Sequence, residues 1–373
     1  MTASVPAAAM RTSAYDVQLL FPVLLLVGVG IVMIYSASSA LAADRWGDGY
    51  FFLKRQGMFA AAGVVVLVVC RHLPYRWFKP LAYPILILAV AILVLVLIPG
   101  FGKTAGGATR WLRLGAFTLQ PSEFARFALI LYLAYSLSKK GNAVREFAIG
   151  FVPHAAVLTL LAVPILMQPD FGSVVILTLI TGTLMFVGGV PLTQLAAAAA
   201  VALPIGGLLA MTADYRFKRV MSFMNPWDYP TAEGYQVIHS LMAFGSGGVG
   251  GSGIGRSLQK LYYLPEPHTD FIFSVIGEEL GLIGVGIVIV LYGVILWRSC
   301  GIARRTTDPF GSLMAIGLTA GLYFQVCINM GVALGLLPTK GLTLPFLSYG
   351  GSSLLLNMAA VGILMNIGAT ARR

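Results

Sequence analysis

Long apolar segments separated by short polar connections run along almost the whole chain. Ten of them approach the length of about 20 residues that an α-helix needs to cross roughly 30 Å of hydrocarbon. They cover residues 17–42, 57–70, 80–98, 123–138, 147–167, 171–188, 191–211, 271–297, 310–337 and 349–368. The pattern predicts an all-α polytopic membrane protein, with residues 1–373 forming a single membrane domain of ten transmembrane helices.

The composition agrees with a membrane protein. Hydrophobic residues make up 58% of the chain and charged residues 10%, which excludes an ordinary soluble domain. The net charge of +11 would suit nucleic acid, but the basic residues stand singly at helix ends, so we expect no nucleic-acid partner and favour anionic lipids or lipid-linked substrates. The three cysteines lie far apart and no motif has metal-ligand spacing, so metal dependence stays unknown and a divalent cation such as Mg or Mn stays open.

The basic residues of the short connections indicate the orientation. Twelve lie on the side of the termini and seven on the opposite side, so we expect both termini in the cytoplasm and the protein in the cytoplasmic (inner) membrane. The first apolar segment is too long for a signal peptide and lacks a cleavage site, so we expect it to be retained as a span. Most of the acidic residues then face outward.

The longest connection, residues 212–270, joins the seventh and eighth predicted spans on the outer side. Connections of this length are usually functional or contain elements of their own, and residues 235–244 have helical spacing. The run Gly248-Val249-Gly250-Gly251-Ser252-Gly253 fits G-x-G-x-x-G, but no buried strand precedes it, so we interpret it as a glycine turn rather than a dinucleotide site. Gly277-x-x-x-Gly281 predicts close helix packing.

Asp270 stands where this connection meets the eighth predicted span. Pro265 and Pro267 stiffen the approach, so the chain reaches Asp270 unwound and then enters a helix. Asp270, Ser274 and Glu278 then repeat at i, i+4 and i+8 on one helix face. Carboxylates near a membrane span are costly and indicate function. The alternative is structural: Asp270 or Thr269 caps the helix, and both Glu278 and Glu279 pair with cations elsewhere in the chain.

Other outer connections carry further candidates. Glu123 and Arg126 are one helical turn apart, so they either pair with each other or contact substrate. Arg110 and Arg126 offer forked donors that suit phosphate oxygens. A turn at residues 168–172 places an amide and a carboxylate, Gln168 and Asp170, beside a proline, and it either shapes a tight bend or lines a site. Lys340 is a lone lysine in an apolar, glycine-rich connection, where snorkelling is the simplest interpretation.

These motifs together resemble the SEDS family of shape, elongation, division and sporulation proteins. The resemblance covers nearly the whole chain and rests on Pro-Glu-Pro-His-Thr-Asp-Phe-Ile-Phe (265–273), Gly-Glu-Glu-Leu-Gly (277–281), Gln-Pro-Asp-Phe-Gly (168–172), Gln-Pro-Ser-Glu (120–123) and Leu-Pro-Thr-Lys-Gly-Leu-Thr-Leu-Pro-Phe-Leu-Ser-Tyr-Gly-Gly-Ser-Ser (337–353). Within the family, Lys340 and the run after it are similar to division-type rather than elongation-type members.

The resemblance implies a peptidoglycan glycosyltransferase that polymerises lipid II on the outer face of the membrane, at the division septum. It also implies that Asp270 is required, and that a class B penicillin-binding transpeptidase and other divisome membrane proteins are partners. We expect Asp270 to act as catalytic general base, with undecaprenyl pyrophosphate as leaving group. The expected substrate-binding residues are Arg110, Glu123, Arg126, Gln168, Asp170, His268, Thr269, Glu278, Lys340 and Ser348. A lipid II flippase, an elongation-type polymerase and a scaffold are the rival hypotheses.

Overall fold

The computed structural model describes residues 15–105, 108–115, 117–211, 214–231, 234–261 and 263–371, and these are mostly helical. A long helix lies at each predicted apolar segment. These helices are α1 (Val17–Trp46), α2 (Phe51–His72), α3 (Phe78–Leu97), α4 (Pro121–Lys140), α5 (Val152–Met167), α6 (Phe171–Val187), α7 (Leu192–Met211), α10 (Ile272–Arg305), α11 (Pro309–Ala333) and α12 (Gly351–Ala371).

Seven helical segments of the described chain are long and apolar enough to cross a membrane. They are Val17–Trp46, Phe51–His72, Tyr75–Leu97, Phe147–Met167, Ile272–Arg305, Pro309–Ala333 and Gly351–Ala371. α6 and residues 192–208 of α7 are apolar but shorter. The prediction of a mostly helical, multi-pass membrane protein is therefore confirmed, although three of the ten predicted spans fall outside these seven segments.

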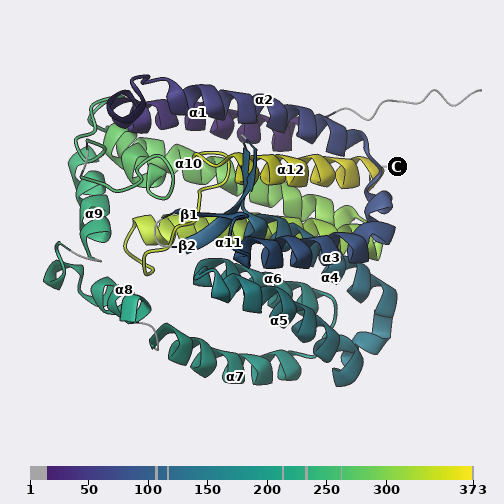
Figure 1. The fold of residues 1–373 in the computed structure, drawn as a ribbon. Coiled ribbons are helices and arrows are strands. Elements are labelled where there is room, and N and C mark those ends of the chain that lie inside the picture. The colour runs from purple at the N-terminus through teal and green to yellow at the C-terminus, as the bar shows by residue number, and fades with distance from the viewer. Residues whose placement is uncertain are drawn as a thin grey trace, which may run out of the picture.

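The long helices are arranged in layers (Figure 1). α1 and α2 form the top layer in this view, α10 and α12 lie next to them, and α11, α3 and α4 follow. α5 and α6 come below, and α7 runs along the bottom edge. α2 packs along α12 and α1 along α10, while α4, α11 and α12 carry much of the buried core.

The two ends of the bundle differ. The end that holds the C-terminus in Figure 1 is tied by Arg298, which pairs with Asp16 at 2.7 Å, and by the Tyr75 hydroxyl, which donates to Asp308 at 3.0 Å. α8 (Asp214–Met224) and α9 (Tyr235–Gly247) lie at the opposite end. The long connection thus contains helices of its own, and the predicted helical spacing over 235–244 is confirmed by α9.

The connection before α4 departs from the all-α prediction. Three antiparallel strands pair in the order β1-β2-β3, namely β1 (Gly102–Ala105), β2 (Ala108–Leu114) and β3 (Phe117–Leu119). In the register, Lys103 lies opposite Trp111, and Arg113 lies opposite Thr118. Strands of three to seven residues are too short to stand out in a search for spans, and for this reason the sheet was missed.

α10 is interrupted at Gly281, whose φ of 65° and ψ of −165° are not helical. The glycine-rich segment 247–253 packs against this break, and the Leu282 amide donates to the Gly248 carbonyl at 2.9 Å. Backbone groups that the break removes from the helical ladder therefore find partners in the glycine segment, as buried peptide groups require.

The glycines at this junction serve packing. A side chain on Gly277 would overlap the ring of Phe244 on α9, which confirms the predicted close approach at the Gly277-x-x-x-Gly281 repeat. The G-x-G-x-x-G run follows helix α9 rather than a strand, in agreement with its interpretation as a turn.

Candidate active site

Asp270 lies in the last turn before α10. The helix begins at Ile272, and the residue at its N-cap is Phe271, with no side-chain cap hydrogen bond. The predicted place at a helix mouth is thus correct, but another residue holds the cap position. The Asp270 side chain is half-buried, and among the described residues no hydrogen bond or ion pair reaches its carboxylate oxygens. It is a carboxylate available for chemistry.

Its surroundings raise the pKa of Asp270 to about 7. Burial is the main cause, because it disfavours the charged form, and the negative charge of Glu266 adds to it. The positive charges of Arg110 and Arg219 oppose the rise. A carboxylate of this pKa is a suitable general base near neutral pH, because it is partly ionised there and binds a proton more strongly than an ordinary Asp.

Two loops meet at this carboxylate. They are the Asp270 loop (residues 264–271) and the Lys340 loop (residues 334–350). Gly341 passes so close that a Cβ built on it would lie 3.0 Å from Oδ2 of Asp270. The Ser348 hydroxyl donates to the Thr269 carbonyl at 2.5 Å. The predicted candidates Thr269 and Ser348 therefore lie at the junction of the two loops, where they fix one loop to the other.

Arg110, on β2, reaches the turn between α5 and α6. Its Nε donates to the carbonyl of Gln168 at 3.0 Å, and its NH2 donates to the carbonyl of Pro169. The Gln168 side chain in turn donates to the carbonyl of Leu93 at 3.0 Å. Arg110 is thereby fixed beside the site, and in the described chain its other N–H groups meet no protein acceptor.

Lys340 comes to the same turn from the other side. Its ammonium lies 4.9 Å from the centre of the Phe171 ring, half-buried rather than extended into solvent. Burial lowers the pKa of Lys340, whereas the charge of Asp170 opposes that change and Arg219 adds to it. Asp170 itself caps α6, because its carboxylate accepts hydrogen bonds from the Ser173 amide at 3.2 Å and hydroxyl at 2.6 Å.

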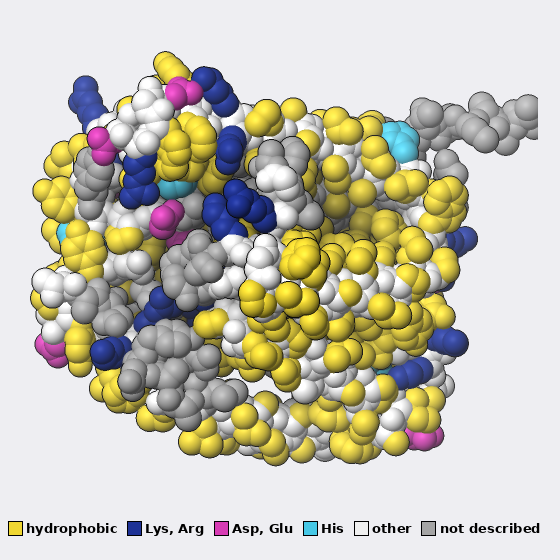
Figure 2. Space-filling model, in the orientation of Figure 1, with side chains coloured by type: hydrophobic (Ala, Val, Ile, Leu, Met, Phe, Trp, Pro, Cys, Tyr) yellow, Lys and Arg dark blue, Asp and Glu magenta, His cyan; other side chains and the backbone are white. Residues whose placement is uncertain are grey.

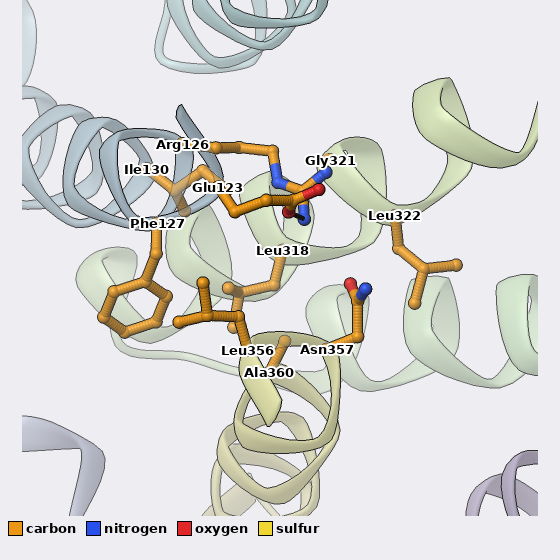
Figure 3. Close-up of a pocket in the computed structure, with 10 residues that line it drawn as sticks. All are labelled: Glu123, Arg126, Phe127, Ile130, Leu318, Gly321, Leu322, Leu356, Asn357 and Ala360. Atoms are coloured by element: carbon orange, nitrogen blue, oxygen red, sulfur yellow. Dashed lines mark hydrogen bonds and ion pairs between the residues drawn. The ribbon is translucent and has the colours of Figure 1, made fainter. Parts of the chain in front are cut away.

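Glu123 and Arg126 lie side by side inside the bundle and point toward each other (Figure 3). They pair at 2.5 Å, which confirms the pairing interpretation, and a substrate contact stays a prediction. Arg126 also donates to Gln325 on α11, whose amide donates to the Thr343 carbonyl of the Lys340 loop at 2.9 Å. The pocket beside them is lined by Glu123, Arg126, Phe127, Ile130, Leu318, Gly321, Leu322, Leu356, Asn357 and Ala360.

Glu278 and Glu279 are both fully engaged. Glu278 is 2% exposed and accepts hydrogen bonds from the Ser257 hydroxyl and, at 2.9 Å, from the Leu258 amide. Glu279 pairs with Lys260 at 2.7 Å, and the Ser36 hydroxyl of α1 donates to it at 2.7 Å. The structure therefore gives Glu278 a role in anchoring the connection before Asp270, and a substrate contact for it stays a prediction.

His268 lies buried between two aromatic rings. The ring centre of Phe52 is 4.4 Å away and that of Tyr349 is 5.8 Å away. Burial, with a smaller effect of the Arg45 charge, lowers the pKa of His268 to about 4, so the imidazole is neutral at physiological pH. The ring thus helps to pack the Asp270 loop on α2, and its predicted substrate contact is untested.

Lys and Arg side chains gather around a few Asp and Glu side chains at the end of the molecule that holds α9 and the sheet (Figure 2). The rest of this face is predominantly hydrophobic, as expected for a surface in contact with lipid. The described residues contain no group of three or more His, Cys, Asp or Glu side chains arranged to hold a metal ion.

Four residues of this region were not recognised in the sequence. Lys260 is the cation that Glu279 required, and Arg219 is the second positive charge near Asp270. Gln325 and Asn329 are polar side chains at i and i+4 of an apolar segment, and polar side chains inside a predicted span are themselves a signal of function, even where no charged motif is present.

Comparison with known proteins identifies the family. The family model described as "Cell cycle protein", for FtsW, RodA and SpoVE, matches residues 17–373. A protein of Trichlorobacter lovleyi named "Probable peptidoglycan glycosyltransferase FtsW" is 47% identical over 359 residues, which cover 96% of this chain and 94% of that protein. A protein of the same name from Geobacter metallireducens is 45% identical over 353 residues, or 95% and 94% of the two chains.

A solved structure agrees with the sequence relatives. It is described as "Structural coordination of polymerization and crosslinking by a peptidoglycan synthase complex", and one of its chains matches with a TM-score of 0.80 and 30% identity, over 96% of this chain and 99% of that chain. The resemblance to the SEDS family is therefore confirmed. The chain belongs to the family of cell cycle proteins that contains FtsW, RodA and SpoVE.

Proposed function

We propose that this chain is a peptidoglycan glycosyltransferase of the FtsW type, which polymerises lipid II into glycan strands for septal cell-wall synthesis. Its relatives of 45–47% identity are named as such enzymes. The observation that carries the mechanism is Asp270: a half-buried carboxylate without protein partners among the described residues, with a pKa raised to about 7, between Arg110 and the Lys340 loop.

The proposed step is a single displacement at the anomeric carbon of the donor sugar. The 4-hydroxyl oxygen of the acceptor's N-acetylglucosamine forms the new C–O bond as the bond to undecaprenyl pyrophosphate breaks. The hydroxyl proton passes to the Asp270 carboxylate, and both electrons of the broken bond leave with the pyrophosphate oxygen. One displacement inverts an α-linked donor to a β-linked product. Asp270 serves as base because its raised pKa favours proton transfer near neutral pH.

The pyrophosphate leaving group needs positive charge more than it needs an acid. Arg110 suits this role because it is fixed to the α5–α6 turn by two carbonyls and has further N–H donors. Lys340 lies against the same turn. Arg126 is occupied by Glu123 and Gln325, so we assign it to holding the Lys340 loop. No metal-ligand cluster lies among the described residues, and the proposed step uses only side chains of this chain.

The finer topology is also part of this proposal. In the proposed arrangement α4, α6 and α7 join the seven long apolar segments as spans, so that both termini lie on one side of the membrane. The distribution of basic residues makes this side the cytoplasm, with Asp270 at the outer face. The layered bundle supports this arrangement, because the end of α12 and the start of α1 lie opposite α8, α9 and the sheet. We further propose location at the septum and partnership with a class B penicillin-binding transpeptidase, since a structural relative belongs to a complex for polymerization and crosslinking.

The test is strand synthesis from lipid II by the purified protein in liposomes. Wild type should form glycan strands, and Asp270→Asn should bind lipid II but lose about 10²- to 10⁴-fold in rate, the usual effect of removing a general base. Asp48→Asn changes an exposed carboxylate at the turn between α1 and α2 and serves as the matched control. It should polymerise as wild type does.

Other outcomes separate the rival functions. Relocation of lipid II without strands would identify a flippase, and neither activity would leave a scaffold. Normal polymerisation by Asp270→Asn would remove Asp270 from the chemistry, because an Asn of the same size preserves the local structure. Failure to co-purify with the cognate transpeptidase in mild detergent, with equal activity in its absence, would overturn the proposed partnership.

A further inference from the structure

One side chain of α11 joins the two loops of the candidate site. Asn329 is 2% exposed, and its Nδ2 donates to the carbonyl of Asp270 at 3.0 Å and to the carbonyl of Leu342 at 2.5 Å. The first carbonyl belongs to the residue that carries the reactive carboxylate, and the second lies two residues after Lys340. Asn329 is therefore a direct bridge between the Asp270 loop and the Lys340 loop.

The other half of this amide has no partner. Oδ1 of Asn329 is buried and meets no donor among the described residues. A buried acceptor without a hydrogen bond is destabilising, so a residue that served only stability would be expected to satisfy it. The donating half of the amide is thus the half that joins the two loops.

A second amide one helical turn earlier supports the same loop. Gln325 donates to the carbonyl of Thr343 at 2.9 Å, so Gln325 and Asn329, at i and i+4 of α11, hold two consecutive peptide groups of the Lys340 loop. Only Asn329 also reaches the backbone of Asp270. It thus joins Asp270 itself to the Lys340 loop, beside the hydrogen bond of Ser348 to the Thr269 carbonyl.

We propose that Asn329 is a positioning residue for glycosyl transfer, which holds the Asp270 carboxylate against the Lys340 loop in one fixed geometry. This inference rests on the proposed function. Its structural consequence is visible at Gly341, where a Cβ would lie 3.0 Å from Oδ2 of Asp270. The backbone of Gly341 therefore packs against one side of the carboxylate.

Charged groups face Asp270 from several elements. Glu266 lies on its own loop, Arg110 on β2, Arg219 on α8, and Lys340 next to Gly341. Because no hydrogen bond among the described residues fixes the carboxylate itself, its position depends on the backbone around it. Without the Asn329 bridge the Ser348 hydroxyl still holds the Thr269 carbonyl, but Asp270 is no longer held against the Lys340 loop. More of the carboxylate is then exposed to water, and the pKa of Asp270 falls toward its ordinary value.

The experiment is the pH dependence of lipid II polymerisation by the full-length protein in liposomes. Asn329→Leu keeps the size of the side chain and removes both donated hydrogen bonds. We expect the plateau rate to fall about 10- to 100-fold, as misplacement of a reacting group by about 1 Å can do. The midpoint of the pH–rate profile should move to lower pH, and KM for lipid II should change little. Asn329→Gln, which keeps the amide donors, should recover part of the rate.

Asn366 provides a matched control. It is a buried asparagine on α12 that also bridges two backbone groups, because its Oδ1 accepts from the Tyr75 amide at 2.9 Å and its Nδ2 donates to the Arg71 carbonyl at 2.8 Å. It lies at the opposite end of the bundle. Asn366→Leu should lower the yield of folded protein but leave the rate per folded molecule and the pH midpoint unchanged.

The outcomes separate this inference from the proposed function. A wild-type protein without polymerase activity would overturn the function. An active wild type and an inactive Asp270→Asn, together with a wild-type rate and midpoint in Asn329→Leu, would overturn the role of Asn329 alone. If Asn329→Leu does not fold, Asn329→Ser keeps one donor and loses the bridge, and an unchanged rate and midpoint in that variant would overturn the inference equally.

Discussion

Asp270 and Glu279 lie nine residues apart at the same junction, yet their carboxylates have contrasting surroundings. Glu279 is 1% exposed and is bound by the Lys260 ammonium at 2.7 Å and the Ser36 hydroxyl at 2.7 Å. Asp270 is half-buried and has no such partner among the described residues. The comparison shows how one region separates structural charges from a reactive one: a carboxylate whose hydrogen bonds are complete stabilises the fold, and an incomplete one is free to bind a proton.

The same distinction extends to other acidic groups. Glu278 is held by Ser257 and the Leu258 amide, and Glu123 is held by Arg126 and Gln325. All three glutamates tie together segments far apart in the sequence. These networks keep the frame around Asp270 rigid, which a preorganised site requires.

The largest effect on stability should come from Glu279. Glu279→Ala leaves Lys260 buried without its counter-charge, and breaking a buried pair in this way typically costs about 3–5 kcal/mol. We expect a large fall in the free energy of unfolding in detergent, measured by thermal or denaturant unfolding. The double variant Lys260→Met/Glu279→Leu, which removes both charges, should recover most of the loss.

An exposed ion pair at the same end is the control for this prediction. Lys54 and Asp48 pair at 2.8 Å with side chains 68% and 39% exposed, so Lys54→Ala should cost at most about 1 kcal/mol. Equal losses for Glu279→Ala and Lys54→Ala would show that Glu279 is not a structural charge. The contrast between Glu279 and Asp270 would then fail.

A smaller effect, on activity, is expected at Arg126. Arg126→Ala removes the hydrogen bond to Gln325 and so loosens the contact of Gln325 with Thr343 in the Lys340 loop. We expect the polymerisation rate to fall about 10-fold, through a misplaced loop, with a modest loss of protein. The measurement is the rate of strand growth per folded molecule.

A second variant distinguishes positioning from substrate contact at this site. Glu123→Gln/Arg126→Met removes both charges and leaves Gln325 free to hold Thr343, so it should regain much of the rate if Arg126 acts through the network. A double variant as slow as Arg126→Ala, with KM for lipid II raised in both, would instead indicate that Arg126 binds the substrate.

The sequence predicted the helical frame well because long apolar segments carry their own signal. Each predicted segment lies at a long helix, and the proline-stiffened approach correctly placed Asp270 just before α10. The pattern of apolar residues did not predict the short sheet or the break of α10 at Gly281, because neither feature changes the hydropathy over the length of a span.

The partners of the charged residues could not be predicted in the same way. Glu279 is paired with Lys260, 19 residues earlier, and Asn329 bridges Asp270 and Leu342. Such pairings depend on how loops fold back on the bundle, and spacing along the chain does not encode that. A local pair such as Glu123 with Arg126, one helical turn apart, could be predicted from the sequence, because helical spacing alone brings the two side chains together.

The smallest predicted effect concerns the stability cost of the reactive carboxylate itself. Because the pKa of Asp270 is raised from 3.8 to about 7, the folded protein binds this proton more tightly than the unfolded chain does. Stability from this group is therefore complete below about pH 4 and is lost as the pH rises toward 7. Asp270→Asn has no such titration, so above pH 7 it should be more stable than wild type. We expect a gain of about 1 kcal/mol, which is smaller than the full pKa shift would give because partial exposure of the side chain screens its charge. Unfolding measured at pH 5 and pH 8 should show the gain of the variant growing with pH. A variant less stable than wild type at pH 8 would mean that Asp270, like Glu279, is held by the fold and not kept free for chemistry.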